Sequence, residues 1–208
     1  MTVNKALDLV YAAKNEEELA AGYAAWAAGY DRETAELGYC LPFVITGWLA
    51  RYVPAGEGPL LDAGCGTGLT GPYAKALGYD DVEGLDLSEE MLEVARGRKA
   101  YTRLEKAALG ERLPWPDDYF RAFFASGVFT EGHAPASAFD DLVRITARGG
   151  HAMFTIRDSI IERNGFRERF DALAAAGKWR LVEETPTFRP YAIAEPEIGV
   201  KVFVFEVL

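Results

Sequence analysis

The chain has 208 residues, half of them hydrophobic, which is enough apolar side chain to bury the core of one domain. Its formal net charge is −10 at pH 7, and it contains no run of lysine or arginine. A protein this acidic is repelled by a phosphate backbone or an anionic surface, so nucleic acid is disfavoured as a partner. Charged residues interrupt every apolar stretch before it reaches the length of a membrane span, so no membrane association is expected.

The two cysteines and the N-terminal residues indicate the cellular compartment in which the protein is expected. Cys40 and Cys65 are too few for a disulfide framework and lack the spacing of a metal site. Asp8 breaks the apolar run that follows Lys5, so the N-terminus is not expected to act as a signal peptide. These observations predict a cytoplasmic protein with reduced thiols and no bound metal. They say nothing of its oligomeric state.

Two helices are expected in the first 55 residues. Asn15 followed by Glu18 is typical of an N-cap with its capping-box partner, and predicts the start of a helix. A second helix is predicted over Leu41–Tyr52, beginning near Pro42. Without strand signals in this part, we expect residues 1–55 to form a helical lid. The first helix carries large side chains at helical spacing on one face: Leu19, Tyr23, Trp26 and Tyr30.

From residue 59 onward, strands and helices alternate. This alternation is typical of βαβ units, and therefore of a parallel sheet. The predicted strands are Leu60–Ala63, Val82–Leu87, Tyr101–Ala107 (the weakest), Ala122–Gly127 and Ala152–Ile156. The predicted helices between them are Gly68–Leu77, Ser88–Arg96 and Pro135–Ala147.

The end of the chain breaks this alternation. After a predicted helix at Phe166–Ala176, two strands are expected at Trp179–Glu183 and Val200–Val207, joined by a proline-rich link without a helical pattern. Two strands without a helical crossover pair antiparallel more readily than parallel. The predicted fold is therefore α/β: one domain over residues 1–208, whose core over 56–208 is a doubly wound, mostly parallel seven-stranded sheet ending in an antiparallel hairpin.

A glycine-rich loop after the first predicted strand is the strongest functional signal. Leu60–Ala63 runs directly into Gly64-Cys65-Gly66-Thr67-Gly68 and then into a helix. Glycine allows positive φ angles and close approach of a ligand to the backbone. The loop also falls at the carboxyl end of a strand, where open α/β sheets bind their ligands. The sequence therefore predicts a ligand site at this loop.

An acidic residue ends the next predicted strand. Asp86 follows Gly68 by 18 residues, at a spacing that suits a carboxylate accepting hydrogen bonds from both hydroxyls of a ribose. Ser88 is placed to cap the following helix, with Glu89 and Glu90 in its first turn. The loop and Asp86 together predict a nucleoside-containing cofactor.

Two kinds of cofactor fit a loop of this type. Gly66, Gly68 and Gly71 satisfy the G-x-G-x-x-G pattern of dinucleotide sites, so a nicotinamide-dependent oxidoreductase is an alternative. Asp62, however, stands at the strand end, four residues before Gly66. A carboxylate there repels a pyrophosphate and attracts the ammonium and sulfonium groups of S-adenosylmethionine.

Several segments resemble motifs of class I S-adenosylmethionine-dependent methyltransferases. The resemblance implies their Rossmann-like fold and methyl transfer that leaves S-adenosylhomocysteine. Two further segments make the chain similar to the Williams–Beuren-region methyltransferase-like proteins within that class. The class motifs are Asp62–Gly68, Gly84–Leu92 and Leu113–Pro116, and the narrower likeness rests on Tyr23–Asp31 and Ser126–His133.

The resemblance also implies roles for single residues. Ala108 stands where these proteins often have an acidic residue that recognises the adenine amino group, which implies recognition by backbone here. Around the methionine part of the cofactor the resemblance places Asp62, Gly64, Gly66 and Gly68, with Cys65 as a small residue of that loop. On the nucleoside it places Asp86 at the ribose and Leu87 and Met91 on the adenine ring. Along the edge of the adenine it places Ala107, Ala108 and Leu109. Ser126 and Gly127 are placed where the methyl donor meets the methyl acceptor.

Three aromatic residues within the Tyr23–Asp31 and Ser126–His133 segments are further candidates. His133 follows the fourth strand of the core and can accept a proton at neutral pH, so it is a candidate general base; the alternative is a helix cap or a loop hydrogen bond. The resemblance implies that the first helix folds over the cofactor, so Trp26 and Tyr30 are candidates to face the sulfonium, since aromatic faces attract cations; the alternative is simple packing on the sheet.

The sequence does not identify the methyl acceptor, which we expect to be a small molecule. A regulatory protein that binds the cofactor without transferring its methyl group is a further alternative to an enzyme.

Overall fold

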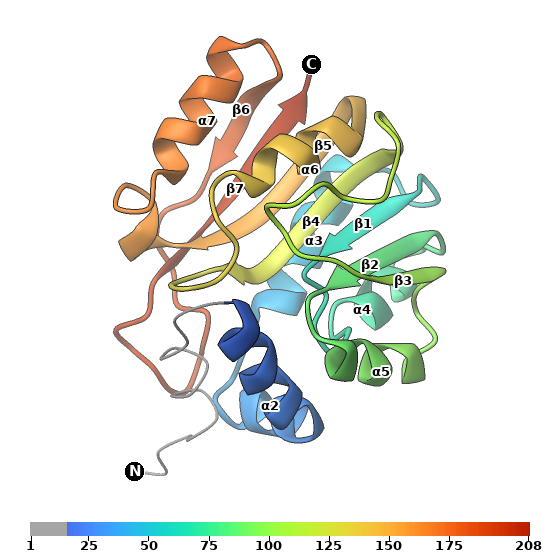
Figure 1. The fold of residues 1–208 in the computed structure, drawn as a ribbon, viewed down its shortest axis with the longest axis vertical. Helices are drawn as coiled ribbons and strands as arrows, with labels where there is room; N and C mark the ends of the chain where they lie inside the picture. Colours follow the sequence, from blue (N-terminus) through green and yellow to red (C-terminus); the bar gives the residue numbers. More distant parts are fainter. Residues whose placement is uncertain (1–15) are drawn as a thin grey trace.

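The computed structural model describes residues 16–208, and its centre is a seven-stranded sheet with helices on both faces (Figure 1). The predicted capping box at Asn15 lies outside the described residues. The strand order is β3-β2-β1-β4-β5-β7-β6. The strands are β1 (Leu60–Ala63), β2 (Val82–Asp86), β3 (Arg103–Lys106), β4 (Phe120–Phe129), β5 (Thr146–Arg157), β6 (Trp179–Glu184) and β7 (Val200–Val207).

The sheet is parallel from β1 to β5, and β7 pairs antiparallel with both β5 and β6. The predicted fold class and antiparallel hairpin are therefore confirmed. The helices are α2 (Glu16–Glu36), α3 (Leu41–Tyr52), α4 (Gly71–Ala76), α5 (Glu89–Gly97), α6 (Ala138–Ile145) and α7 (Phe166–Ala175), with a 3-10 turn at Asp158–Ile160.

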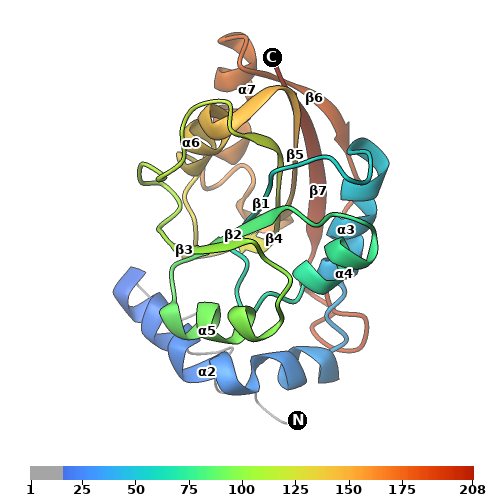
Figure 2. The same ribbon diagram turned by 90° about the vertical axis from the view of Figure 1, so that its right-hand side faces the viewer.

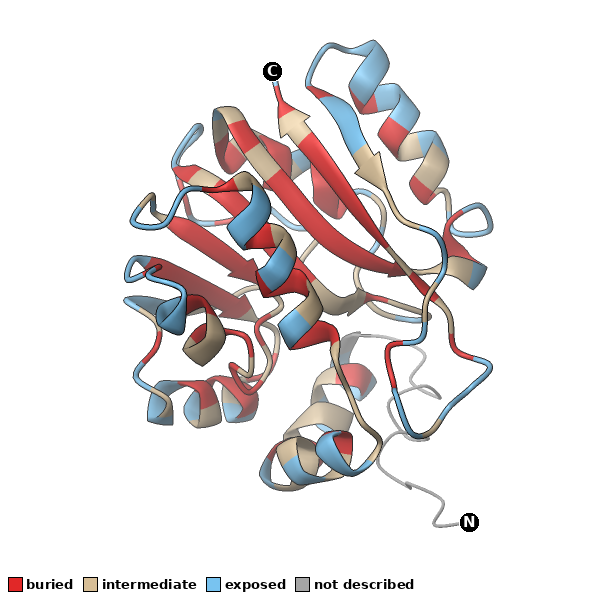
Figure 3. Cartoon of the chain, turned by 180° about the vertical axis from the view of Figure 1, so that it is seen from behind, coloured by how far each residue is buried: buried red, intermediate tan, exposed pale blue. Residues whose placement is uncertain are grey.

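The two faces of the sheet carry separate cores, because its central strands are buried on both sides (Figure 3). Helices α6 and α7 cover one face with an aromatic cluster in which Phe139 and Phe170 pack around Phe154 of β5. Helices α3 and α4 cover the other face, where Ile45 and Leu49 are fully buried (Figure 2). Helix α3 thus packs into the core, although the sequence pattern placed it in the lid segment.

Three predicted helices are shorter than expected, α7 by one residue only. Helix α4 begins at Gly71 rather than Gly68, because Gly68 has a φ of +77° that no right-handed helix contains. Helix α6 ends at Ile145 rather than Ala147, since Thr146 is already extended and pairs with Phe120 of β4. Strand β5 consequently begins six residues earlier than the predicted Ala152.

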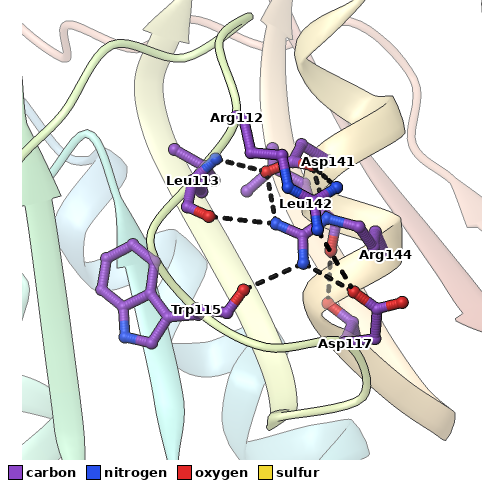
Figure 4. A network of polar contacts seen from close by, with 8 residues as sticks. Arg112, Leu113, Trp115, Asp117, Asp141, Leu142 and Arg144 are labelled. Carbon is purple, nitrogen blue, oxygen red and sulfur yellow. Dashed lines mark hydrogen bonds and ion pairs between the residues drawn. The ribbon is translucent and has the colours of Figure 1, made fainter.

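An arginine of α6 fixes the loop between β3 and β4 (Figure 4). The Arg144 guanidinium donates hydrogen bonds to the carbonyls of Leu113 at 3.1 Å and Trp115 at 2.9 Å, and to the Asp117 carboxylate at 2.8 Å. Asp141, one helical turn earlier, accepts from the Leu113 N–H at 2.5 Å. These charge-assisted bonds hold the Leu113–Pro116 motif against the sheet.

Helix α2 packs against α5 at the end of the molecule to which the parallel strands point (Figures 1 and 2). Asp31 of α2 accepts a hydrogen bond from the Thr67 hydroxyl at 2.6 Å and forms an ion pair with Arg98. Arg98 also donates to the Thr67 carbonyl at 2.5 Å. These contacts tie α2 to the glycine loop. No helix in residues 16–208 is long and apolar enough to cross a membrane.

Candidate active site

A cleft of about 990 Å³, counting its open mouth, lies at the carboxyl ends of β1, β2 and β4. The glycine loop forms its floor, and α2 contributes to its wall. Most of the residues that the sequence singled out line this one cleft, although they come from segments more than 100 residues apart. They are Tyr30, Gly64, Cys65, Gly66, Asp86, Leu87, Met91, Ala107, Ala108, Leu109, Ser126, Gly127 and His133.

The glycine loop turns tightly because its three glycines lie in the left-handed region, Gly64 with a φ of +78°, Gly66 with +55° and Gly68 with +77°. The N–H groups of Gly64 and Cys65 both donate to the Leu85 carbonyl of β2, at 2.9 and 2.8 Å. This fixes the loop to the neighbouring strand. A Cβ at Gly64 would overlap the Val128 side chain, whereas a Cβ at Gly66 would meet nothing within 4 Å.

The two glycines should therefore respond differently to alanine. Gly64→Ala adds about 1–2 kcal/mol of left-handed strain and about 1–3 kcal/mol of overpacking against Val128, so we expect a loss of about 2–5 kcal/mol in the free energy of unfolding. Gly66→Ala should lower the free energy of unfolding only by the cost of left-handed strain. Its methyl group would stand at the cleft, however, and weaken ligand binding. Urea unfolding and calorimetric titration separate the two effects. Equal losses of stability would show that Val128 moves aside.

Asp86 lines the cleft and also holds two backbone N–H groups in place. Its Oδ2 accepts from the Gly66 N–H at 2.8 Å, and its Oδ1 accepts from the Ser88 N–H at 2.9 Å. The Ser88 hydroxyl in turn caps α5 by accepting from the Met91 N–H at 3.2 Å, as predicted. Burial raises the pKa of Asp86, which these backbone hydrogen bonds partly oppose.

Asp62 does not line the cleft. Its side chain is 1% exposed and accepts a hydrogen bond at 2.8 Å from the Tyr101 hydroxyl, which itself accepts from the Gly71 N–H at 3.1 Å. Burial raises the pKa of Asp62 to about 7, and the negative charge of Asp86 adds to the rise. Two carboxylates thus lie close together beside the cleft, and a cation bound there would stabilise the ionised form of both.

His133 has partners on both ring nitrogens. Nδ1 lies 2.8 Å from the Glu131 carbonyl oxygen and 2.9 Å from the Thr130 hydroxyl, and Nε2 lies 2.8 Å from the Tyr23 hydroxyl of α2. Because a carbonyl can only accept, the proton belongs on Nδ1, and Nε2 accepts from Tyr23. Burial lowers the pKa of His133, which favours the neutral ring.

Two other predicted cofactor residues lie beside the cleft rather than on its wall. Trp26 is 3% exposed, donates to the Glu33 carboxylate at 2.8 Å and stacks on Tyr23, so in this structure it packs within α2. Gly68 lies at the end of the loop, where a Cβ would stand 2.9 Å from the Tyr101 ring. The absence of a side chain at Gly68 therefore leaves room for the Tyr101 ring.

Sequence reasoning missed several wall residues, among them Tyr23, Tyr39 and Thr67. Tyr39 lies over the backbone of Gly127, and Thr67 joins the glycine loop to α2. Tyr23 had been placed only in the apolar stripe of its helix. A residue pair such as Tyr23 and His133 is separated by 110 positions, and no spacing signal connects the two.

Comparisons with known proteins bear on this geometry. A model of the methyltransferase domain family matches residues 61–154, which hold the glycine loop and Asp86. Human methyltransferase-like protein 27 is 32% identical over 176 residues, covering 80% of this chain and 70% of that protein. The chain belongs to the S-adenosylmethionine-dependent methyltransferases. The resemblance to the Williams–Beuren-region methyltransferase-like proteins is confirmed by the same relative.

Solved structures share the fold of this methyltransferase. A chain in the complex of the Haloferax volcanii Trm112 methyltransferase activator with a methyltransferase has a TM-score of 0.67 and 18% identity, covering 89% of this chain and 97% of that chain. A TehB-like methyltransferase from Corynebacterium glutamicum has a TM-score of 0.66 and 19% identity, with coverages of 90% and 99%. Both likenesses show the Rossmann-like methyltransferase fold.

Proposed function

We propose that this methyltransferase binds S-adenosylmethionine in the cleft and transfers the methyl group to a small-molecule acceptor. The observation that carries the proposal is the cleft itself, where the glycine loop meets the half-buried carboxylate of Asp86, with the buried carboxyl of Asp62 behind the loop. A ligand with a ribose and two positive groups suits these features, because it offers hydroxyl donors to Asp86 and balances the buried negative charge.

The residues present fit the cofactor. Gly66 has open space beside its backbone, so the methionine part can approach the loop there. Asp86 would hold the ribose, and Leu87, Met91 and Ala107 offer apolar surface to the adenine. Asp62 would act through the loop and through its charge rather than by direct contact, since Tyr101 covers it.

The chemistry supplied by the bound cofactor is a methyl group on a positively charged sulfur. The protein contributes alignment and exclusion of water, both of which lower the barrier to a displacement of this kind. Ser126 and Gly127, on β4, would line the passage between donor and acceptor. Helix α2, tied to the loop through Asp31, would serve as part of a lid.

The remaining expectations belong to the same proposal. A net charge of −10 favours an uncharged or cationic small molecule over nucleic acid. We propose action in the cytoplasm and without a metal ion. Within residues 16–208, no group of three or more His, Cys, Asp or Glu side chains is arranged to hold one.

Cofactor binding can be tested by thermal unfolding. At a concentration about 100 times Kd, S-adenosylmethionine or S-adenosylhomocysteine should stabilise the protein by about 2.7 kcal/mol and raise Tm by about 5–10 °C. NAD at the same concentration should leave Tm unchanged. A shift with NAD alone would favour a nicotinamide-dependent enzyme. Binding of S-adenosylmethionine without release of S-adenosylhomocysteine, across a panel of acceptors, would favour a regulatory protein.

A further inference from the structure

Two acidic residues in the described part of the chain are almost fully buried, Asp62 with 1% exposed and Glu83 with 4%. The Glu83 carboxylate accepts a hydrogen bond from the Trp115 indole N–H at 2.6 Å and lies 3.8 Å from the Arg103 guanidinium. Asp62 has one hydrogen bond within the described residues, from the Tyr101 hydroxyl, and no ion pair. Because burial without a cation penalises the ionised form, Asp62 differs from Glu83 in lacking compensation for a negative charge.

No positive group separates Asp62 from the cofactor cleft. The cleft wall includes Gly64, two residues after Asp62, and the Cys65 thiol. A Cβ at Gly84 would stand 3.0 Å from the Cys65 sulfur and 3.2 Å from the Tyr101 ring, so the thiol lies beside the tyrosine that donates to Asp62. Burial and the negative charge of Asp62 raise the pKa of Cys65, which keeps the thiol neutral. Charges interact strongly across a neutral, buried layer of this kind.

The other charges around the cleft do not compensate Asp62 either. Among the described residues that line the cleft, none is lysine or arginine, and Asp86 carries a negative charge. His133 also lines it, but burial lowers the pKa of this ring and keeps it neutral. Outside the loop, Arg98 is already paired with Asp31. Burial raises the pKa of Asp62 to about 7, the hydrogen bond from Tyr101 opposes the rise, and the charge of Asp86 adds to it.

We propose that Asp62 is a specificity-determining residue that distinguishes the methyl donor from its product by charge. Its carboxyl keeps a proton when the cleft is empty or holds S-adenosylhomocysteine, and releases that proton to solvent when S-adenosylmethionine binds. This inference rests on the proposed function and adds to it the residue that sets the preference for donor over product. The two ligands suit such a residue, because the sulfur is positively charged in the donor and neutral in the product.

The exchange leaves the net charge of the site unchanged, since one proton leaves as one positive charge enters. A cation held in the cleft favours the ionised form of Asp62, and the ionised form in turn attracts the cation. Once the sulfur is neutral, Asp62 takes a proton back from solvent and this attraction ends. Because donor binding releases a proton, donor affinity should rise as pH increases toward 7 and level off above it, whereas product affinity should not follow this course.

Calorimetry in two buffers counts the protons directly. S-adenosylmethionine and S-adenosylhomocysteine are each titrated into the wild-type protein at pH 7 in PIPES and in imidazole, whose ionisation enthalpies differ. Since Asp62 is about half protonated at this pH, the donor should release about 0.4–0.5 proton more than the product. Equal release by the two ligands overturns the inference. Failure of both ligands to bind contradicts the proposed function instead.

Asp62→Asn then assigns the proton to its residue. Asparagine resembles the protonated carboxyl in size and charge, so the variant should fold, which circular dichroism establishes. Between pH 5.5 and pH 7, the preference for donor over product, measured as the ratio of their Kd values, should rise about five- to tenfold in wild type and stay constant in the variant. Protons that the ligands themselves exchange are the same with both proteins and cancel in this comparison. A preference that rises equally in both proteins overturns the inference.

Asp81→Asn is the matched control. It makes the same chemical change at an exposed carboxylate that immediately precedes β2, at the end opposite the cleft. It should retain the wild-type proton release and the wild-type rise in preference for the donor. If Asp81→Asn abolished the rise as Asp62→Asn does, the effect would belong to the overall negative charge of the protein, and the assignment to Asp62 would be wrong.

Discussion

Replacing Asp86 by alanine is expected to weaken binding of S-adenosylmethionine by about 2–3 kcal/mol, a rise in Kd of roughly 30- to 150-fold. The physical reason is the loss of a carboxylate that faces the cleft and can accept two charge-assisted hydrogen bonds from the ribose hydroxyls. The same change frees the N–H groups of Gly66 and Ser88, so the free energy of unfolding should also fall by about 1–3 kcal/mol.

Asp81→Ala provides the comparison for this experiment. Asp81 immediately precedes the same strand at its opposite end, is exposed, and accepts a hydrogen bond from the Thr102 hydroxyl at 3.2 Å. Its removal should leave cofactor affinity unchanged. Calorimetric titration of both variants, with circular dichroism to establish folding, gives the result. Wild-type affinity in a folded Asp86→Ala protein would mean that the ribose is held elsewhere.

The second large effect concerns pH and Asp62. Burial raises the pKa of this carboxyl from its ordinary 3.8 to about 7, so the folded protein holds a proton that the unfolded chain releases. The stability from this proton is complete below about pH 3.8, is lost as pH rises toward 7, and changes no further above it. A shift of about three units corresponds to about 4 kcal/mol.

Asp62→Asn isolates this contribution, because asparagine is neutral at every pH and keeps an oxygen for the Tyr101 hydroxyl. Between pH 4 and pH 8, the stability of wild type relative to this variant should fall by up to about 4 kcal/mol. Urea unfolding at intervals across that range measures both proteins, and titrating groups distant from Asp62 cancel in the difference. A constant difference would mean that Asp62 ionises at its ordinary pKa. Added S-adenosylhomocysteine should leave the sign of the trend unchanged.

The fold was largely predictable from local pattern. The bounds of β1, α3 and β7 coincide with the predicted ones. Pro59 and Gly64 flank β1, Pro54 lies shortly after α3, and Gly199 precedes β7.

One error arose where strand pairing overrode a helical pattern: Thr146 had been assigned to a helix, but it pairs with Phe120 as a strand. Another arose at Gly68, whose positive φ delays the start of α4 to Gly71. The order of strands within the sheet could not be read from the sequence, since it depends on which helix crosses which face.

The parts of the candidate site that lie in continuous sequence motifs could be predicted from the sequence. The glycine loop and Asp86 come from adjacent βα units, so their meeting at one sheet edge follows from topology. The direction of a buried side chain does not follow in the same way. Asp62 faces Tyr101, and Trp26 packs within its helix, because these positions depend on neighbours distant in sequence.

The position of β7 between β5 and β6 also determines which parts of the sheet can form while the chain is still being synthesised. Strand β6 is synthesised before β7, yet within the described sheet β7 is its only neighbour. Until residues 200–207 leave the exit tunnel, β6 has no partner, β5 presents an open edge, and α7 lacks Phe203 and Phe205 beneath it. Open edges invite pairing with other chains, so a nascent chain stalled in the proline-rich link would depend on chaperones to remain unaggregated.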